Sequence, residues 1–371
     1  MLAVQLTEWG CEPQLRAVAV PEPRGAELLL QVTAAGLCRS DLHVMDAAES
    51  SFDYPLPLTL GHEVAGTVID AGPDADRSWL GEAVVVHGIW SCGHCRNCAR
   101  GRENYCMTLR PRADGRLAPI GNGLGHHGGL AQAMVVPSAR YLVRTGDLAP
   151  AVAAPLADAG ATAYHAVRQH ADVIDESAIC VVIGVGGLGH LAIQILRHFG
   201  AGRILAVDNR PETRPVALQL GSDAAFADLT AAIPALDGGA DLILDFVGTS
   251  DTMESAARAL APGGRLVVVG SAGGGLAVGK HIGLASGWQV NAPFWGARSD
   301  LEAVVALAIN EKLHVEATTY PLTDAVAIYR RLRAGTVTGR AVLVPPLLTS
   351  HGPQHAEASR QISNVAREVG R

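Results

Sequence analysis

Four cysteines lie close together in the first third of this chain of 371 residues, with the spacing C-x2-C-x2-C-x7-C: Cys92, Cys95, Cys98 and Cys106. Four thiolates from one loop can close a tetrahedral shell around Zn²⁺, which is typical of a structural site. An iron–sulfur cluster also uses four thiolates and is the main alternative. We expect a loop held by structural zinc. A zinc finger that binds nucleic acid is not expected, because only a few arginines lie around the cysteines.

A glycine-rich turn forms a second pattern. A predicted strand at 179–183 is followed by Gly-x-Gly-x-x-Gly and then by a helix-compatible run at 190–199. Such glycines allow a tight turn and the close approach of a pyrophosphate to the positive end of the helix dipole. The pattern therefore predicts dinucleotide binding by Gly184, Gly186, Gly187, Leu188 and Gly189.

Asp208 follows the next predicted strand, at 204–207. Its carboxylate is placed to accept hydrogen bonds from an adenosine ribose and would repel a 2′-phosphate, which favours NAD over NADP. Arg210, two positions later, could restore some binding of NADP.

A third group of candidate residues is scattered along the chain. Cys38 follows a strand in Gly-Leu-Cys-Arg-Ser-Asp-Leu-His, His62 and Glu63 lie in Gly-His-Glu, and Asp158 lies in Pro-Leu-Ala-Asp-Ala-Gly. Each alone has an ordinary explanation as a small core residue, a turn or a helix cap. Together they offer sulfur, nitrogen and oxygen ligands to a metal with an open coordination position.

Composition narrows the class of protein. Hydrophobic residues make up 49% and charged residues 18% of the chain, a composition that predicts a folded protein and argues against a disordered one. The net charge of −7 argues against nucleic-acid binding. Seven cysteines do not resemble a disulfide framework, and the N-terminus lacks a signal-peptide pattern, so we expect a cytoplasmic, reducing setting. The apolar stretch 178–196 contains four glycines and fits a strand–turn–helix better than a membrane span.

The pattern of predicted secondary structure changes near residue 158. Up to about 155, short apolar runs broken by Gly and Pro predict an all-β domain, and from 158 to 294 strands alternate with helices, as in an α/β parallel sheet. The segment 300–334 is expected to be helix-rich, and 340–344 is expected to be a strand that returns to the first domain. A weak helical pattern at 357–369 lies in a C-terminal extension, 346–371.

Taken together, the motifs above and Gly-Arg-Ala-Val-Leu-Val-Pro at 339–345 resemble the zinc-dependent medium-chain alcohol dehydrogenases, particularly the bacterial NAD-dependent secondary alcohol dehydrogenases, over roughly residues 1–345. The resemblance implies a Rossmann domain with a doubly wound parallel sheet at 159–294. It also implies a mostly-β GroES-like catalytic domain that is discontinuous, at 1–158 and 295–345.

The resemblance also assigns roles to residues. Cys38, His62 and Asp158 would bind the catalytic zinc, although Asp158 departs from the two-cysteine form; the four-cysteine loop would bind the structural zinc. Glu63 would lie near the catalytic metal, and Asp41 would hydrogen-bond His62 from behind. Ser40 and His43 would form a proton relay. Arg39 and Arg340 would contact the cofactor pyrophosphate. Trp295 and Trp90 would form walls of the substrate pocket.

The implied reaction interconverts secondary alcohols and ketones, with primary alcohols and aldehydes as a wider option. A zinc-bound alkoxide would release hydride to NAD, so the cofactors are NAD and two zinc ions per chain. The partner is a small alcohol or ketone, and the resemblance implies a homodimer or homotetramer. The alternatives are a zinc-free quinone or enoyl reductase on the same fold, which the intact ligands oppose, and a non-enzymatic zinc-binding module, which the charge and the glycine turn oppose.

Overall fold

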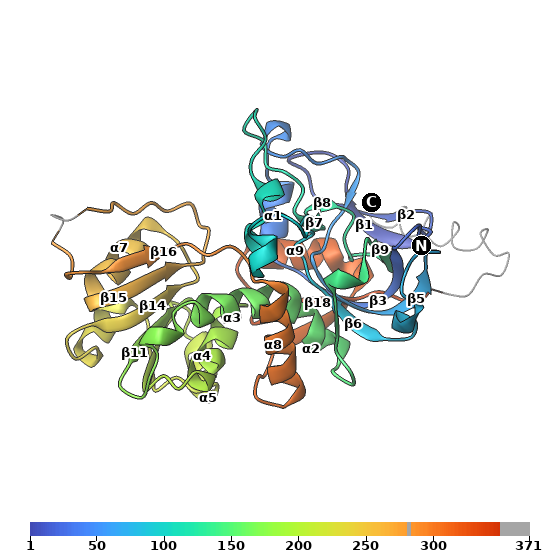
Figure 1. Ribbon diagram of the computed structural model, residues 1–371. Coiled ribbons are helices and arrows are strands. Elements are labelled where there is room, and N and C mark those ends of the chain that lie inside the picture. Colours follow the sequence, from blue (N-terminus) through green and yellow to red (C-terminus); the bar gives the residue numbers. More distant parts are fainter. Residues whose placement is uncertain (280–282, 349–371) are drawn as a thin grey trace.

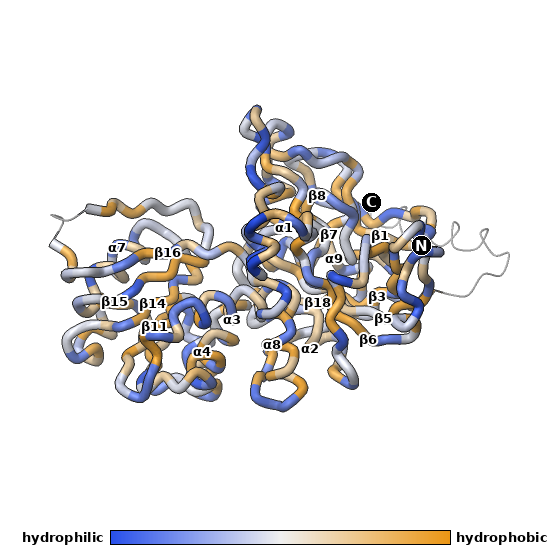
Figure 2. The backbone as a smooth tube through the Cα atoms, viewed as in Figure 1, coloured by the Kyte–Doolittle hydropathy of each residue, from blue (hydrophilic) through white to orange (hydrophobic). Residues whose placement is uncertain are grey.

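The computed structural model describes residues 1–279 and 283–348, which form two lobes lying side by side (Figure 1). One lobe carries the mostly antiparallel sheets and both ends of the described chain. The other carries a parallel sheet between helices. Figure 2 shows hydrophobic stretches concentrated along the strands of both lobes. One large buried cluster fills the first lobe and two lie against the parallel sheet; one of these two also includes Val85 and Val143 of the first lobe, so the hydrophobic packing continues from one lobe to the other.

The first lobe is built on a seven-stranded sheet with the order β10-β6-β5-β3-β18-β17, where β9 also pairs with β3. The long central strand β3 is buried along nearly its whole length, because other elements cover both of its faces. The strands of this sheet are β3 (Leu28–Gly36), β5 (Glu63–Ala71), β6 (Ala83–Val86), β9 (Ala133–Val136), β10 (Leu142–Arg144), β17 (Ala317–Pro321) and β18 (Arg340–Val344).

Smaller elements complete this lobe. A three-stranded sheet has the order β2-β1-β4, and a two-stranded sheet pairs β7 with β8. Their bounds are β1 (Leu2–Leu6), β2 (Gln14–Ala17), β4 (Leu58–Thr59), β7 (Gly121–Asn122) and β8 (Gly125–His126). The helices are α1 (Arg39–Met45) and α9 (Ala325–Arg333), and the 3₁₀ turns are η1 (Glu49–Ser51), η2 (Arg77–Trp79), η3 (Cys98–Arg100), η4 (Glu103–Tyr105), η5 (Met107–Leu109), η6 (Ala139–Tyr141) and η10 (Leu322–Asp324).

The second lobe is a Rossmann fold. Its six parallel strands have the order β13-β12-β11-β14-β15-β16, which reverses direction between β11 and β14, where such sheets bind nucleotides. The strands are β11 (Ile179–Ile183), β12 (Arg203–Val207), β13 (Ala224–Phe226), β14 (Ala240–Asp245), β15 (Leu260–Val268) and β16 (Gln289–Asn291). The helical elements are α3 (Ala161–Arg168), η8 (Ala171–Val173), α4 (Gly189–His198), α5 (Thr213–Gln219), α6 (Leu229–Ala232), η9 (Ile233–Ala235) and α7 (Ser250–Ala259).

The connection between the lobes is helical and irregular. Helix α2 (Pro150–Pro155) packs against β3 and β5 and continues into a π-helical turn, η7 (Leu156–Gly160), which leads into α3. A π-turn inserts one extra residue into a helix and is frequent at functional sites. Returning from the second lobe, the chain enters α8 (Arg298–Ile309), which packs against α3 and η7.

The segment 300–334 is helix-rich, as predicted, but it also contains a strand that the sequence pattern does not indicate: β17 lies between α8 and α9 and pairs in parallel with β18. The β-branched pair Thr318 and Thr319 suits this strand, but its apolar spacing also fits a helix. Helix α2 was also not expected, since a run of small residues has no clear period.

Strand β18 pairs with β3 of the first lobe. Most of the predicted C-terminal extension, 349–371, lies outside the described residues, and the weak helix expected at 357–369 lies there too. Among the described helices, none is both long and apolar enough to cross a membrane.

Candidate active site and metal centres

Cys38, His62 and Asp158 meet at the junction of the two lobes, and all three are buried with ligand atoms within 4.8 Å of one another. Cys38 follows β3 and His62 precedes β5; these strands pair with Gly36 opposite Glu63, which brings the two residues together. Asp158 comes from the π-turn. Its Oδ2 lies 3.3 Å from the Cys38 sulfur and 3.5 Å from His62 Nε2.

This donor set fits a zinc ion. Thiolate, imidazole and carboxylate are all ligands of Zn²⁺, and the separations of 3.3 and 3.5 Å suit atoms about 2.0–2.3 Å from one ion. Nε2 of His62 is buried and has no hydrogen-bond partner among the described residues. A buried nitrogen in that position is costly unless a metal or another partner satisfies it.

The charges around the site keep Asp158 anionic. Burial opposes ionisation, but the neighbouring His62 and the positive charge of Arg340 outweigh it, so the pKa of Asp158 lies below its usual value. Thr162 donates a hydrogen bond of 3.0 Å to the other carboxylate oxygen, which leaves Oδ2 directed at the other two ligands. On the far side of the imidazole, Asp41 Oδ1 lies 3.0 Å from His62 Nδ1.

Glu63 and Arg340 form a buried ion pair beside the candidate metal site. Burial raises the pKa of the Glu63 carboxyl, and the positive charge of Arg340 opposes that rise. Glu63 Oε1 also accepts a hydrogen bond of 3.3 Å from the backbone of Ala159, next to Asp158. A Cβ added to Gly187 would lie 2.5 Å from the Arg340 guanidinium, so Arg340 lies between the glycine turn and Glu63.

The expected relay residues lie on α1, directly after Cys38. Ser40 is half-buried, with Oγ 3.6 Å from the Cys38 sulfur, whereas His43 and Arg39 are exposed. The structure therefore places a hydroxyl at the metal site and an imidazole toward solvent on the same helix.

The two tryptophans expected at the substrate pocket differ in their surroundings. Trp295 is buried with its ring centroid 5.3 Å from that of His62, and its Nε1 donates to the carbonyl of Ala157 at 3.1 Å. Trp90 is half-buried and stacks with Tyr141 and His126 instead. Trp295 thus lies beside the candidate metal ligands and Trp90 does not, and the pocket role of both residues stays a prediction.

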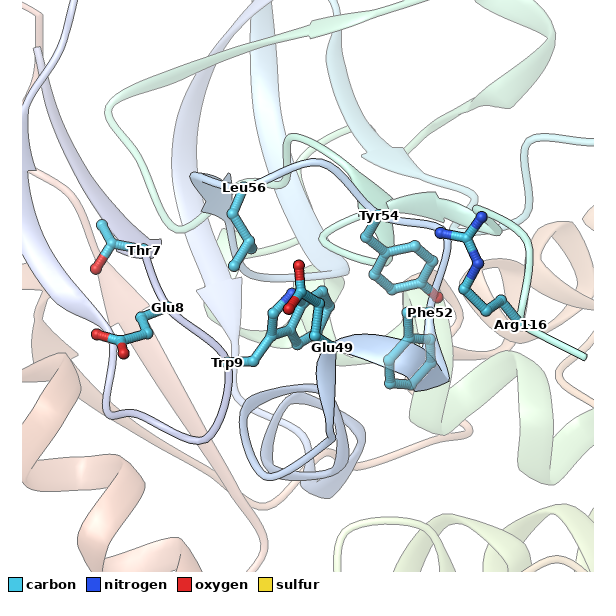
Figure 3. A pocket seen from close by; sticks show the side chains of 8 residues that line it. All are labelled: Thr7, Glu8, Trp9, Glu49, Phe52, Tyr54, Leu56 and Arg116. Carbon is cyan, nitrogen blue, oxygen red and sulfur yellow. The ribbon is translucent and has the colours of Figure 1, made fainter. Parts of the chain in front are cut away.

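A surface pocket of about 450 Å³ lies elsewhere on the first lobe (Figure 3). Its aromatic residues form a stack in which the rings of Trp9 and Phe52 lie 5.9 Å apart and those of Phe52 and Tyr54 lie 4.6 Å apart. None of the three candidate metal ligands lines it, so it is distinct from the metal site.

The predicted cofactor turn connects β11 to α4. Gly184 and Gly186 lie in the turn, Leu188 occupies the N-cap position of α4 and Gly189 is its first residue. The turn lies at the carboxyl end of β11, beside the reversal in strand order. It thus has the position and backbone freedom needed to hold a pyrophosphate.

Asp208 lies at the end of β12 with both carboxylate oxygens engaged. Oδ2 accepts a hydrogen bond of 2.8 Å from the backbone of Val185, and the Arg210 side chain contacts both oxygens at 3.1 and 3.2 Å. Burial opposes ionisation, but the Arg210 contacts keep the pKa of Asp208 below its usual value. Asp208, the residue expected to bind the adenosine ribose, is thus paired with Arg210, the residue expected to allow some binding of NADP.

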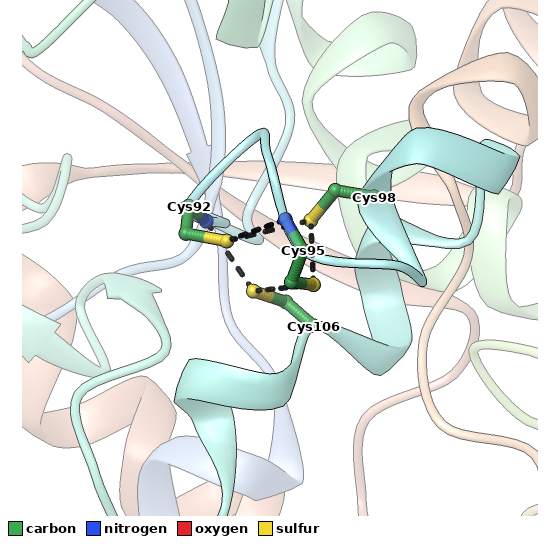
Figure 4. A group of neighbouring side chains, drawn as sticks. All are labelled: Cys92, Cys95, Cys98 and Cys106. Atoms are coloured by element: carbon green, nitrogen blue, oxygen red, sulfur yellow. Dashed lines mark hydrogen bonds between the residues drawn. The ribbon is translucent and has the colours of Figure 1, made fainter.

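The four cysteines converge in one loop that surrounds η3 and η4 (Figure 4). Neighbouring sulfurs lie 3.5–3.9 Å apart, close to the edge of about 3.8 Å of a tetrahedron with Zn–S bonds of about 2.3 Å. This spacing favours one ion over an iron–sulfur cluster, which spreads its thiolates over several irons. Backbone N–H groups of Met107 and Cys98 lower the pKa of Cys95 to about 6, which favours its thiolate, whereas burial and the neighbouring Cys95 raise the pKa of Cys98.

Two residues that orient the candidate metal site are not among the residues predicted from the sequence. Tyr329, on α9, donates a hydrogen bond of 2.9 Å to Asp41 Oδ2, and Thr162 orients Asp158. Tyr329 lies almost three hundred positions from Asp41 and follows an ordinary amphipathic helical pattern, so no local signal marks it. Thr162 lies four residues after Asp158, which is one helical turn, so its spacing is a usable signal.

With this geometry established, comparisons with known proteins define the class. Residues 24–147 match the family model of the alcohol dehydrogenase GroES-like domain, and residues 187–310 match that of the zinc-binding dehydrogenases. The chain therefore belongs to the zinc-dependent medium-chain alcohol dehydrogenases. It is an oxidoreductase that acts on CH–OH groups.

Individual relatives agree with this assignment. The D-arabinose 1-dehydrogenase (NADP(+)) of Saccharolobus solfataricus is 35% identical, with 88% of this chain and 93% of the relative covered. The NAD-dependent alcohol dehydrogenase of Sulfolobus acidocaldarius is 33% identical, with 92% of this chain and 99% of the relative covered. Among solved structures, the alcohol dehydrogenase of Aeropyrum pernix has a TM-score of 0.83 at 29% identity, covering 93% and 100%. The structure of acetophenone reductase from Geotrichum candidum in complex with NAD has a TM-score of 0.79 at 30% identity. The match covers 92% of this chain and 96% of that one.

Proposed function

We propose that this alcohol dehydrogenase uses NAD to interconvert secondary alcohols and ketones, with primary alcohols and aldehydes as further substrates. We further propose that each chain holds two zinc ions, a catalytic one at Cys38, His62 and Asp158 and a structural one at the four cysteines. The observation that carries the proposal is the buried Cys–His–Asp group, connected through Glu63 and Arg340 to the glycine turn. A zinc-free reductase would have no need for such a donor set.

The bound zinc would act as a Lewis acid that makes the alcohol hydroxyl more acidic. Around it, Asp41 holds the His62 ring so that Nε2 faces Cys38 and Asp158. Ser40, whose Oγ lies 3.6 Å from the Cys38 sulfur, would receive the substrate proton, and His43, exposed on α1, would pass it on to solvent. Trp295 would bound the space for the substituents of the alcohol.

The cofactor proposal rests on the turn and on Asp208. The glycine turn and the N-terminus of α4 would hold the pyrophosphate, with its charge balanced by Arg340 and Arg39. Asp208 would bind the adenosine ribose once Arg210 moves aside, and its charge would repel a 2′-phosphate. The NAD-dependent relatives and the NAD complex of acetophenone reductase support NAD.

A second candidate substrate class is a sugar. The relative of 35% identity is named D-arabinose 1-dehydrogenase (NADP(+)), and Arg210 beside Asp208 is a group that could pair with a 2′-phosphate. Oxidation of an aldose with NADP is therefore the alternative to oxidation of simple secondary alcohols with NAD.

The test combines metal analysis with a substrate panel. Purified enzyme is analysed for zinc and assayed with NAD and NADP against secondary alcohols, primary alcohols and D-arabinose, before and after chelation. We expect two zinc ions per chain and turnover of secondary alcohols with NAD that chelation abolishes. Fewer than two zinc ions, or turnover that survives complete metal removal, contradicts the proposal; faster oxidation of D-arabinose with NADP supports the alternative.

The proposal extends to organisation and location. Sheet membership supports a catalytic domain at 1–158 and 295–345 around a Rossmann domain at 159–294. None of the seven cysteines is paired in a disulfide, which supports a reducing, cytoplasmic setting. Exposed Val290 and Phe294, at and after β16 on the sheet edge, support a homodimer or homotetramer, which light scattering after size-exclusion chromatography tests.

A further inference from the structure

Trp295 lies against the candidate metal ligands in a backbone conformation that its surroundings must maintain. Its φ is +53°, in the left-handed region that bulky residues avoid on steric grounds. The indole fills the space beside Gly88, where an added Cβ would lie 2.4 Å from its Cζ2. A small change in the backbone at this position would therefore move the indole relative to His62 and Asp158.

The four-cysteine lobe (residues 92–106) holds the chain on both sides of Trp295. Asn104 Nδ2 donates a hydrogen bond of 2.9 Å to the carbonyl of Phe294, and a carboxylate oxygen of Glu103 accepts one of 2.6 Å from the backbone of Arg298. Asn104 is 1% exposed, so water cannot replace its amide without a change in packing.

A buried polar network makes the same connection by a second route. Tyr105 Oη, next in the lobe, lies 2.9 Å from His165 Nε2, and His165 Nδ1 lies 2.7 Å from Asp300 Oδ2. Asp300 also accepts a hydrogen bond of 2.8 Å from the backbone of Ala297, two residues after Trp295. Consecutive residues of one 3₁₀ turn therefore all reach the segment that carries the indole.

We propose that the four-cysteine lobe positions Trp295 at the substrate site, with Asn104 and Glu103 as the positioning residues. Turn η4 lies between Cys98 and Cys106, so an ion held by the thiolates would fix the turn that supplies both side chains. The lobe then sets the fit of the larger substituent of a secondary alcohol, in addition to any role in stability. This inference rests on the proposed function, in which Trp295 bounds the alcohol pocket.

The first experiment separates positioning from a general effect on the lobe. Asn104→Ala removes the hydrogen bond to the Phe294 carbonyl. The control His94→Ala changes an exposed residue of the same lobe, whose Nδ1 lies 2.9 Å from the Cys92 carbonyl, outside η4. For Asn104→Ala we expect the KM for 1-phenylethanol to rise roughly tenfold while kcat for propan-2-ol changes by less than about threefold, because the misplaced indole affects mainly the larger substituent. The control should leave both values near those of the wild type.

A double-mutant cycle tests whether the effect passes through the indole. In a Trp295→Phe background, Asn104→Ala should add little further change, because the residue that it positions is already altered. An effect of Asn104→Ala that persists unchanged in that background overturns the inference. So does a KM pattern identical to that of His94→Ala.

A spectroscopic measurement keeps the test independent of turnover. The chain has five tryptophans, so 5-fluorotryptophan labelling gives five ¹⁹F resonances, and Trp295→Phe identifies the one from Trp295. Asn104→Ala should shift that resonance and leave the other four in place, whereas an unshifted resonance refutes the inference. Should the alanine variant not fold, Asn104→Asp keeps the side-chain size but lacks the amide donor, and the same shift is expected.

The fluorine signal also separates the positioning of Trp295 from the proposed function. If the wild type turns over no alcohol, the proposed function fails. The shift of the Trp295 resonance still decides whether the lobe positions the indole.

Discussion

The Asp41 carboxylate lies 3.0 Å from Nδ1 of His62, so the imidazole is held with Nε2 facing Cys38 and Asp158. Asp41 is itself held from two sides, because it accepts hydrogen bonds from the backbone of Cys38 at 3.1 Å and from the Tyr329 hydroxyl at 2.9 Å. A carboxylate behind a metal-binding histidine orients the ring and makes it more basic.

Asp41→Asn is therefore expected to weaken zinc binding at the Cys38 site by about 10- to 100-fold. Competition with a chromogenic chelator measures this loss, and the zinc of the four-cysteine lobe serves as the internal reference. Tyr329→Phe keeps the carboxylate and should weaken binding less. Equal affinity in wild type and Asp41→Asn would show that Asp41 does not support the site.

Cys38→Ser is expected to reduce zinc from two ions to one per chain and to lower turnover roughly a thousandfold or more, because Lewis-acid stabilisation is lost. NADH binding, measured by fluorescence, should be retained, since the glycine turn is untouched. Cys11→Ser, at an exposed free thiol, is the matched control and should behave like the wild type. Retained turnover in Cys38→Ser refutes the ligand assignment.

Asp208→Ser is expected to shift cofactor preference toward NADP. The substitution removes the negative charge that repels a 2′-phosphate and frees Arg210 from its ion pair. We expect the ratio of kcat/KM for NADP to that for NAD to rise about tenfold or more, in line with the strength of arginine–phosphate pairs. Adding Arg210→Ala should reverse most of the gain; if it does not, Arg210 plays no part in selection.

His190 gives the enzyme a predicted dependence of stability on pH. Its ring lies 2.8 Å from the Gly186 carbonyl through Nδ1, and Nε2 accepts a hydrogen bond of 3.2 Å from the backbone of Glu316, so the neutral ring connects the two lobes. Burial lowers the pKa of His190 to about 4. Below about pH 6.5 the unfolded chain binds a proton at His190 that the folded chain does not bind. The stabilisation of the folded chain by neutral His190 is therefore complete above about pH 6.5 and is lost as the pH falls to about 4.

The size of this effect is about 3 kcal/mol, from a shift of roughly 2.5 pKa units. Urea unfolding at pH 7 and pH 4.5 measures it, with His190→Gln as the comparison because an amide can also donate and accept. The free energy of unfolding of the wild type should fall more steeply with acid than that of the variant. Parallel curves would show that His190 does not stay neutral in the folded chain.

Much of the fold could be predicted from local patterns. The strand, glycine turn and helix from 179 to 199 carry their own signals in β-branched residues, glycines and a helical period, and the structure has them there. The four cysteines are equally local, since one loop supplies every ligand. By contrast, β17 and α2 carry ambiguous patterns, and packing against β18, β3 and β5 determines what they become.

The candidate catalytic site depends on contacts between distant segments. Residue types marked Cys38, His62 and Asp158 as possible ligands, but their convergence requires the pairing of β3 with β5 and the π-turn that presents Asp158. Tyr329 behind Asp41 and Asn104 behind Trp295 had no sequence signal at all. The four-cysteine loop and the glycine turn could be predicted because their residues are neighbours in the sequence. Partners that are a hundred or more positions apart meet only because burial of the hydrophobic clusters brings their elements together.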